Sequence, residues 1–229
     1  MVGVLISTSA NTRTLLLLVI SILLLCKKAA SIPACRTENG GCRESILETI
    51  NNALTQAGTM SHLAHKMYDD IDDPLMRRDQ AVFAARTSCH SKITNPPDSG
   101  AEHTNLKTKK YLKMLINFVG AWSSPLSDLM IELSAMQEVP ESIVSEAKEM
   151  EKKNREILDD LRWILTKAYP TATMIERFPS WHYLPALKSN DIHSKCLAMY
   201  NLCNCLNTDT AYTIYHLRKL KCRLTGEDC

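Results

Sequence analysis

The chain has 229 residues, of which 45% are hydrophobic and 23% charged, enough for one globular domain or at most two small ones. Its formal net charge of +2 excludes a strongly basic or acidic protein. Because lysines and arginines are also spread among acids, we expect neither nucleic acid nor an anionic membrane as the main partner.

The N-terminus has the pattern of a secretory signal. The apolar run from Leu15 to Leu25 is shorter than the roughly 20 residues that cross a bilayer as a helix. Ala29 and Ser31 fit the small-residue positions before a cleavage site. We therefore expect a signal peptide over 1–31 and a secreted, extracellular chain over 32–229, with an uncleaved anchor as the alternative. No later segment is apolar over such a length, so we expect no membrane insertion.

Four helical patterns follow, and no segment shows a convincing strand pattern. Apolar residues spaced three and four apart predict helices over about 43–70, 109–136, 141–168 and 194–221. Pro125 falls inside the second of these, and we expect it to kink or interrupt that helix.

The links between the helices predict their arrangement. The links over about 72–108 and 169–193 are long, whereas the link around 137–140 is short. A short link makes its two helices antiparallel, and a long link permits them to run parallel. The order long, short, long therefore predicts an all-α, up-up-down-down four-helix bundle with two long crossover loops.

The cysteines indicate crosslinks. One of the nine, Cys26, would leave with the signal peptide, and in an oxidising compartment the others form disulfides by default. Counting alone leaves their pairing open. Because Cys203 and Cys205 lack the CxxC spacing of a zinc site, we expect no metal.

The sequence gives little support for an enzymatic function. The chain has no HExxH, no glycine-rich phosphate loop and no GxSxG. The acidic run over 69–73 lacks the ligand spacing of a calcium loop. We therefore expect no catalytic site and no cofactor.

Several segments resemble the prolactin, placental lactogen and growth hormone family. The first half of the family signature is similar to CHSKITNPP, from Cys89, with KKYLKMLINFVGAW, ending at Trp122. The second half is similar to CLNTDTAYTIYHLRKLKC, over 205–222. MQEVPESIVSEAKEMEKKNREIL resembles the third helix of prolactins, and CRTENGGC, from Cys35, resembles a small loop that growth hormones lack. The resemblance covers essentially the whole chain and points to the prolactin branch.

The resemblance implies a secreted, four-helix-bundle, prolactin-like hormone that acts on a cell-surface cytokine-type receptor. We expect a divergent, placental-type member. The alternative is a non-signalling secreted binding module that sequesters a receptor or a matrix ligand.

The resemblance also implies a disulfide connectivity, namely Cys35–Cys42, Cys89–Cys205 and Cys222–Cys229. Two cysteines, Cys196 and Cys203, do not fit this pattern. On one helix their Cα atoms would lie about 10 Å apart, too far for a disulfide. They are expected to be buried free thiols, with a covalent dimer through Cys196 or Cys203 as one alternative and competition between Cys203 and Cys205 for Cys89 as another.

Two receptor-binding surfaces are implied as well. The first would combine two histidines on one face of the first helix with residues of the fourth, and its candidate contacts are His62, His65, Tyr212, His216 and Arg218. Lactogenic members carry a histidine and a carboxylate where this chain has Ala211 and Ile214. Because two imidazoles alone make a poor zinc site, ordinary lactogen-like affinity is not expected.

The second surface departs further from the family pattern. In the family a small glycine on helix three makes a notch for a second receptor, and Asp160 stands at that position here. A carboxylate in the notch would lose its hydration without an evident partner. The alternative is that Asp160 is an exposed helix residue in a protein that does not use the notch. Either reading argues against ordinary receptor homodimerisation.

Overall fold

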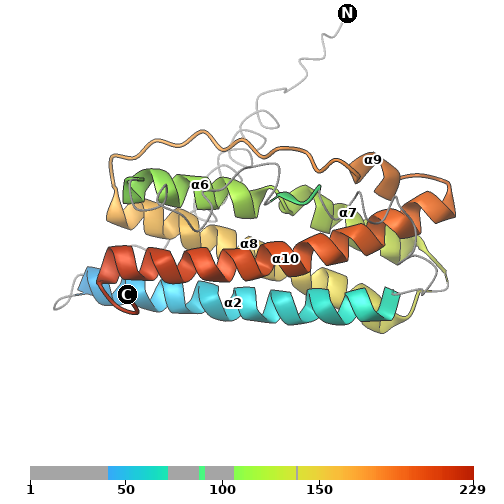
Figure 1. Ribbon diagram of the computed structural model, residues 1–229, viewed down its shortest axis with the longest axis horizontal. Helices are drawn as coiled ribbons and strands as arrows, with labels where there is room; N and C mark the ends of the chain where they lie inside the picture. Colours follow the sequence, from blue (N-terminus) through green and yellow to red (C-terminus); the bar gives the residue numbers. More distant parts are fainter. Residues whose placement is uncertain (1–40, 72–87, 91–105, 138) are drawn as a thin grey trace, which may run out of the picture. The chain divides into compact units, whose positions relative to one another are not determined.

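The computed structural model describes residues 41–71, 88–90, 106–137 and 139–229 (Figure 1). The chain divides into two units, Met1–Glu38 and Asn39–Cys229, and every helix described below belongs to the second. The predicted signal peptide lies outside the described residues, and the predicted Cys35–Cys42 bond lies outside the described side chains.

The described part of the chain is helical and contains no strand. Its helices are α2 (Gly41–Ile71), α6 (Thr108–Gly120), α7 (Ser123–Ala135), α8 (Glu141–Ala168), the short α9 (Leu184–Leu187) and α10 (Ile192–Thr225). The predicted third helix matches α8 at both ends, and the first agrees with α2 within about two residues. The sequence pattern did not indicate α9.

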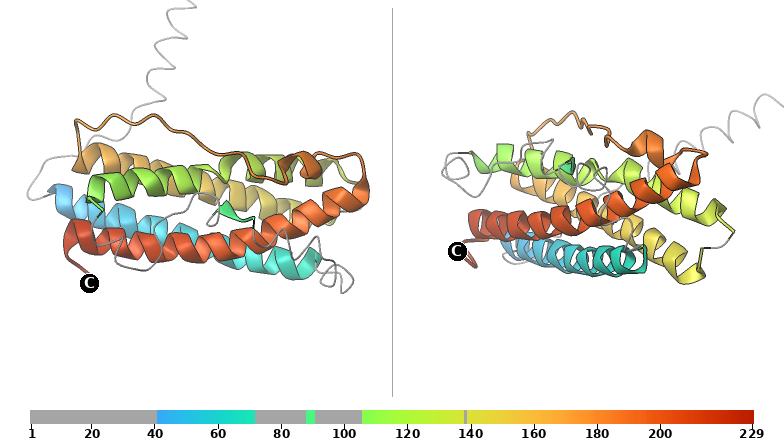
Figure 2. Two further views of the ribbon diagram at one scale, coloured as in Figure 1. Left: turned by 45° about the horizontal axis from the view of Figure 1, so that its top comes forward. Right: turned by 45° about the vertical axis from the view of Figure 1, so that its right-hand side comes forward.

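The helices form an up-up-down-down bundle. Helix α2 packs against α8 and α10, while α6 and α7 pack on α8. Figure 1 shows α2 and the pair α6 and α7 running in one direction, whereas α8 and α10 run in the other. The two views of Figure 2 agree with this arrangement. The predicted fold class is therefore confirmed.

The second helix of the bundle is interrupted, as the position of Pro125 predicts. Helix α6 ends at Gly120, and α7 begins at Ser123 with Pro125 in its first turn. A proline is tolerated there because the first N–H groups of a helix have no intrahelical partner. Trp122 is buried at the break, and its Nε1 donates a hydrogen bond to Oδ2 of Asp209 on α10 over 3.1 Å.

Helix α10 begins and ends on capping residues. Asp191 accepts a hydrogen bond from the backbone N–H of Ser194 over 2.9 Å, which satisfies one orphan donor of the first turn. Gly226 follows the helix with a φ of 77°, a left-handed conformation that glycine adopts readily. These caps explain why α10 extends beyond the predicted range at both ends.

Two disulfides lie within the described side chains. Cys89 pairs with Cys205, with their Cα atoms 5.1 Å apart and 116 positions apart in sequence. Closing so long a loop removes denatured-state entropy worth about 4–5 kcal/mol in the chain-entropy model. Cys222 pairs with Cys229, which holds the tail against the end of α10. Both are pairs that the family resemblance implies.

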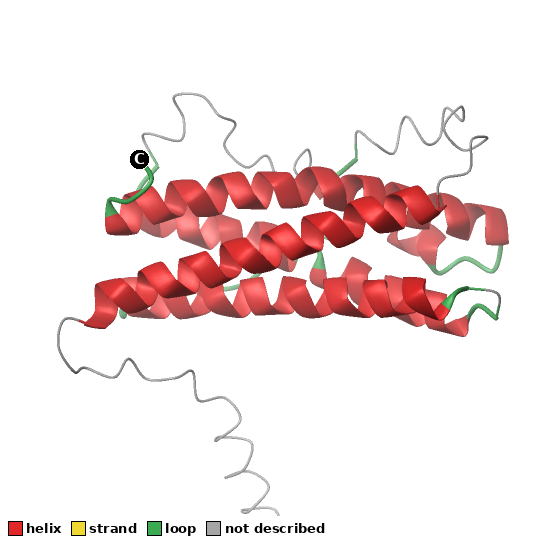
Figure 3. Ribbon diagram, turned by 90° about the horizontal axis from the view of Figure 1, so that it is seen from below, coloured by secondary structure: helices red, strands yellow, loops and turns green. Residues whose placement is uncertain are grey.

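The second crossover is fastened along α6. Lys113 donates to the carbonyl of Thr173, and the Asn117 side chain accepts from the backbone N–H of Arg177 over 3.4 Å. Trp181 is buried, with its ring centroid 6.2 Å from that of Trp122. Figure 1 shows this segment running from the end of α8 at one end of the bundle to α9 near the other, and Figure 3 shows that the described elements are all helices.

Candidate functional site

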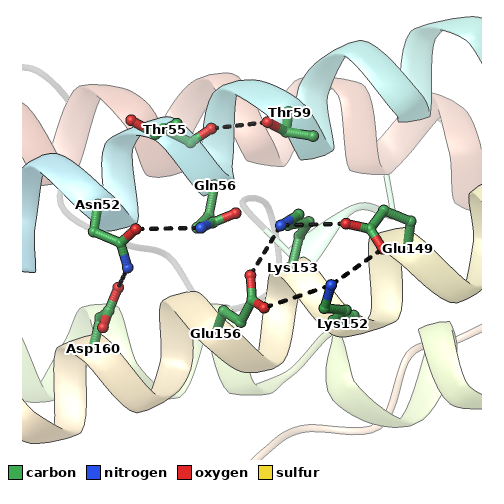
Figure 4. Close-up of polar contacts among 9 residues, drawn as sticks. All are labelled: Asn52, Thr55, Gln56, Thr59, Glu149, Lys152, Lys153, Glu156 and Asp160. Atoms are coloured by element: carbon green, nitrogen blue, oxygen red, sulfur yellow. Dashed lines mark hydrogen bonds and ion pairs between the residues drawn. The ribbon is translucent and has the colours of Figure 1, made fainter.

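A hydrogen bond joins α2 and α8 at the position of the predicted notch. Nδ2 of Asn52 donates to Oδ2 of Asp160 over 2.8 Å, between residues 108 positions apart (Figure 4). Asp160 is half-buried, and this burial raises the pKa of its carboxyl group to about 6. The bond from Asn52 acts in the opposite direction, whereas the charges of Asp159 and Glu156 raise the pKa further.

This bond corrects the expectation that Asp160 lacks a partner. The amide of Asn52 compensates part of the lost hydration of the carboxylate. Asp160 is also more than an exposed helix residue, because it connects two helices of the bundle. Sequence reasoning missed Asn52, since nothing in the pattern of α2 distinguishes it from the other polar residues on the outer face.

Further polar contacts continue along the same seam. Gln56 donates to Oδ1 of Asn52 over 3.3 Å. Nζ of Lys153 lies 3.1 Å from Glu156 and 3.2 Å from Glu149, and Lys152 reaches Glu149 at 3.6 Å. The bond to Lys153 lowers the pKa of Glu149. Figure 4 shows these side chains between the two helices, so the seam is filled by groups that satisfy one another.

The two histidines of the first expected surface lie near the end of α2. Both His62 and His65 are exposed, and Nε2 of His65 lies 3.6 Å from Oδ2 of Asp69, one turn further along the helix. Within the described residues no group of three His, Cys, Asp or Glu side chains is placed to hold a metal. Both imidazole rings therefore face solvent, where a binding partner can reach them.

The expected receptor contacts of α10 lie on different sides of that helix. Arg218 is exposed and Tyr212 is half-buried against Phe118, with ring centroids 5.8 Å apart. His216 instead is fully buried, and its Nδ1 shares a hydrogen bond with the hydroxyl of Tyr111 on α6. The expectation that His216 faces a receptor is thus corrected. The buried positions Thr213, Leu217 and Leu220 already place residue 216 on the core side of the helix.

The two remaining cysteines differ in their surroundings. Cys203 is completely buried, and burial raises the pKa of its thiol to about 12. Cys196 is half-buried. Since Cys205 is the partner of Cys89, Cys203 does not replace it. A covalent dimer through Cys203 would require the bundle to open. Of the two cysteines expected as possible dimer links, the structure therefore leaves only Cys196 accessible.

A buried polar cluster lies where α6 gives way to α7, and sequence reasoning missed it. Asp209 is 1% exposed and accepts from Trp122, whose ring packs edge-on against that of His90 at 4.7 Å. A small cavity beside it is lined by Met60, Val119, Trp122, Asn154, Ile157, Asp209, Thr210 and Thr213. Asp209 lies among buried positions of α10. A polar residue on a buried helix face needs a partner, and this could have indicated the cluster from the sequence.

No helix among the described residues combines the length and the apolar character needed to cross a membrane.

Comparisons with known proteins assign the chain to a family. The model of the somatotropin hormone family matches residues 18–229. Prolactin-8A4 of Rattus norvegicus is 49% identical over 94% of this chain and 95% of its own length, and Prolactin-8A8 of Mus musculus gives the same values. Prolactin-8A6 of Mus musculus is 50% identical over the same shares. The family comprises signalling hormones that act through cytokine-type receptors, not enzymes. The chain belongs to the somatotropin hormone family and, within it, to the prolactin branch.

Proposed function

We propose that this chain is a secreted, prolactin-like hormone of the divergent placental type that engages one cytokine-type receptor and does not recruit a second copy in the ordinary way. Residues 1–31 would direct secretion, and 32–229 would form the extracellular hormone. The family assignment and the resemblance of the N-terminus to a signal peptide support this reading.

The first receptor surface would combine the end of α2 with the outer face of α10. His62 and His65 supply exposed imidazoles, and Arg218 supplies a guanidinium that has no ion-pair partner within the described residues. Tyr212 adds a half-buried aromatic ring. We expect this surface to bind without zinc, because Ala211 and Ile214 cannot serve as a third ligand.

The bond between Asn52 and Asp160 supports the proposal that no second receptor is recruited. Where the family pattern has a glycine, this chain places a carboxylate that reaches across to α2. A receptor side chain that entered here would have to displace the carboxylate and break its bond to Asn52. Asn52 is exposed and Asp160 half-buried in the free chain, and a bound receptor would cover both. A polar group that is covered without its partner costs about 1–3 kcal/mol, so a second receptor would bind weakly.

The stoichiometry of a complex tests this proposal. The purified mature protein is mixed with the soluble extracellular part of a lactogenic receptor, and the mass of the complex is measured by light scattering, with and without zinc. The variant Asp160→Gly reopens the notch. Asp159→Gly is the matched control, since it makes the same substitution at the neighbouring exposed position and carries the same helix penalty of about 1 kcal/mol.

We expect a one-receptor complex for the native chain and for Asp159→Gly, with a gain of the second receptor in Asp160→Gly. A two-receptor complex with the native chain would contradict the role of Asp160. If neither the native chain nor any variant formed a complex, the proposed receptor would be wrong although the fold would stand. That result would favour the alternative, a non-signalling binding module with another partner.

A covalent dimer remains part of the proposal only through Cys196. This thiol is half-buried, whereas Cys203 is enclosed. An electrophoretic comparison with and without reductant, on the native chain and on Cys196→Ser, shows whether a disulfide-linked dimer forms and through which residue.

A further inference from the structure

Five basic side chains gather where the beginning of α6 lies beside the end of α10. They are exposed or half-exposed, and we call them the α6–α10 patch: Lys107, Lys110, Lys113, Arg218 and Lys219. Figure 1 shows these two helix segments next to each other at the same end of the bundle.

Contacts between the two helices fix this neighbourhood. Arg223 on α10 donates to the carbonyl of Leu106 over 2.8 Å, and its guanidinium lies 4.4 Å from the ring centroid of Tyr111. Lys219 precedes Arg223 by one turn and therefore shares its side of α10. Lys107, in the same way, precedes Tyr111 by one turn. Lys107 and Lys219 thus flank one seam, whereas Lys110, Lys113 and Arg218 lie further around their helices.

The patch gathers several basic side chains whose charge no ion pair compensates among the described residues, whereas elsewhere such side chains stand singly, as Lys148 and Lys167 do on α8. Other lysines form ion pairs across the bundle, as Lys188 does with Asp128 at 2.9 Å and Lys195 with Glu132 at 2.5 Å. No residue of the patch has an ion pair with an acid in the described part of the chain. Lys113 donates only to the neutral carbonyl of Thr173. The nearby acids of the tail are occupied by Lys221, which lies 2.6 Å from Asp228.

We propose that the α6–α10 patch binds a linear sulfated polysaccharide. Lys107, at the N-cap of α6, is followed at every third residue by Lys110 and Lys113, so the three extend over about 9 Å along the helix and turn by about 60° from one to the next. Arg218 and Lys219 add charge from the neighbouring helix. Such a band suits a flexible polyanion, which can place successive sulfate groups on successive cations and release counterions as it binds.

A sulfated polysaccharide fits better than an anionic membrane. The inference depends on the secretion proposed above, and anionic lipid is concentrated on the cytoplasmic leaflet, which a secreted protein does not meet. Interfacial helices also need an apolar face for the lipid, whereas Leu112, Leu115 and Ile116 of α6 are buried in the bundle. Residues 1–31 carry Arg13, Lys27 and Lys28 and no acid, so the secreted chain over 32–229 has 24 basic and 25 acidic residues and a formal net charge of −1. Such a chain does not attract polyanions from every side, so binding depends on this band.

Binding of the full secreted chain to immobilised heparin tests the inference, with chemically desulfated heparin as the ligand control. The test variant combines Lys107→Gln, Lys110→Gln and Lys219→Gln. The matched control combines Lys148→Gln, Lys152→Gln and Arg155→Gln on α8, so both variants lose three positive charges. A third variant, with arginine at the three test positions, keeps the charge, and circular dichroism checks that every variant is folded.

We expect the test variant to bind heparin at least about tenfold more weakly near 0.15 M salt. The slope of log K against log salt concentration should also be less steep, by about two to three. The α8 control and the arginine variant should stay within about twofold of the native chain. Equal losses in the test and control variants, or equal binding to desulfated heparin, would overturn the inference.

Binding to phosphatidylserine vesicles but not to heparin would also overturn it in favour of a membrane surface. Because no receptor is present in this assay, its result is independent of the receptor stoichiometry above.

Discussion

The ring of Phe178, in the second crossover, occupies the space in which a Cβ atom on Gly120 would stand. Gly120 is the last residue of α6, so the absence of a side chain there lets the crossover lie directly against the helix. The aromatic ring and the glycine thereby hold the crossover next to the break between α6 and α7.

We predict that Gly120→Ala displaces Phe178 and loosens the crossover, because the new methyl group overlaps the ring. The cost should be about 1 kcal/mol, at the low end for overpacking, because the ring is 39% exposed and can move. Hydrogen exchange and limited proteolysis over residues 169–183 measure the loosening. The double variant with Phe178→Ala should relieve the overlap. Unchanged protection in the single variant would show that the ring moves aside without cost.

Gly58 provides the matched control. It lies inside α2, and a Cβ atom added there meets nothing within 4 Å. Gly58→Ala should therefore stabilise the protein by about 0.5–1 kcal/mol through the gain in helix propensity. The two alanine substitutions are thus expected to have opposite signs in the same denaturation experiment.

Stability should fall in acid because of His90. Burial lowers the pKa of this imidazole from 6.5 to about 4, and only a backbone hydrogen bond with Ala121 opposes the effect. Between these values the unfolded chain binds the proton and the folded chain does not. Stability is therefore intact above about pH 6.5 and is lost as the pH falls toward 4, by up to about 3 kcal/mol.

Urea denaturation between pH 4 and 8 measures this dependence. The variant His90→Gln cannot titrate at that position, so its stability should change less with pH than that of the native chain. His62→Gln, at an exposed histidine on α2, should keep the native dependence. Equal pH dependence of the native chain and His90→Gln between pH 6.5 and 4.5 would contradict the assignment.

Asp160 should act in the opposite direction. Its pKa is raised from 3.8 to about 6, chiefly by burial, so between these values the folded chain binds the proton and the unfolded chain does not. The stability contributed by the group is present below about pH 4 and is lost as the pH rises through 6. We predict that Asp160→Asn gains stability relative to the native chain over this range.

The gain should be on the order of 1 kcal/mol, because partial exposure to solvent screens the charge. The same urea series measures it, and Asp70→Asn, at an exposed position of α2, is the control. A difference between Asp160→Asn and the native chain that does not change with pH would show that the carboxyl group has an ordinary pKa.

Much of the fold could be predicted from the sequence because it depends on local patterns. The apolar spacing in α8 runs from Ile143 to Leu165 with an interruption at Asn154, and Pro140 precedes the helix, so its limits follow from local signals. Pro125 marks the break in the second helix for a similarly local reason. Link lengths then restrict the topology, because only a long crossover lets consecutive helices run parallel.

The parts of the site that were missed depend on contacts between distant residues. Asn52 and Asp160 lie 108 positions apart, and each alone resembles an exposed polar residue on a helix. The family pattern predicts His216 on the receptor side of α10, whereas the structure buries it in the core. The buried positions around it, Thr213 and Leu217, give the correct side.

The two free thiols should differ in reactivity. With iodoacetamide at pH 8, we expect the native protein to be modified at Cys196 and not at Cys203, because Cys203 is enclosed and its pKa is raised to about 12. Denaturation without reductant should expose both thiols. Peptide mapping by mass spectrometry identifies the modified residue, and rapid native labelling of Cys203 would show that the bundle opens around α10.

The hydrogen bond between Tyr111 and His216 should contribute to stability and not to receptor contact. Both side chains are fully buried, and burial raises the pKa of Tyr111, so its hydroxyl stays protonated at neutral pH. Removing the hydroxyl in Tyr111→Phe should cost about 1–2 kcal/mol, because it takes a partner from a buried imidazole. Urea denaturation followed by circular dichroism measures the loss.

Tyr183→Phe, at a half-buried tyrosine in front of α9, is the control and should stay within about 0.5 kcal/mol. Receptor affinity, measured well below the unfolding transition, should be unchanged in Tyr111→Phe and reduced in Arg218→Ala, because only Arg218 lies on the outer face of α10. If Tyr111→Phe instead weakened receptor binding at native stability, the buried pair would have to shape the receptor surface, and His216 would regain a role there through its position in the core.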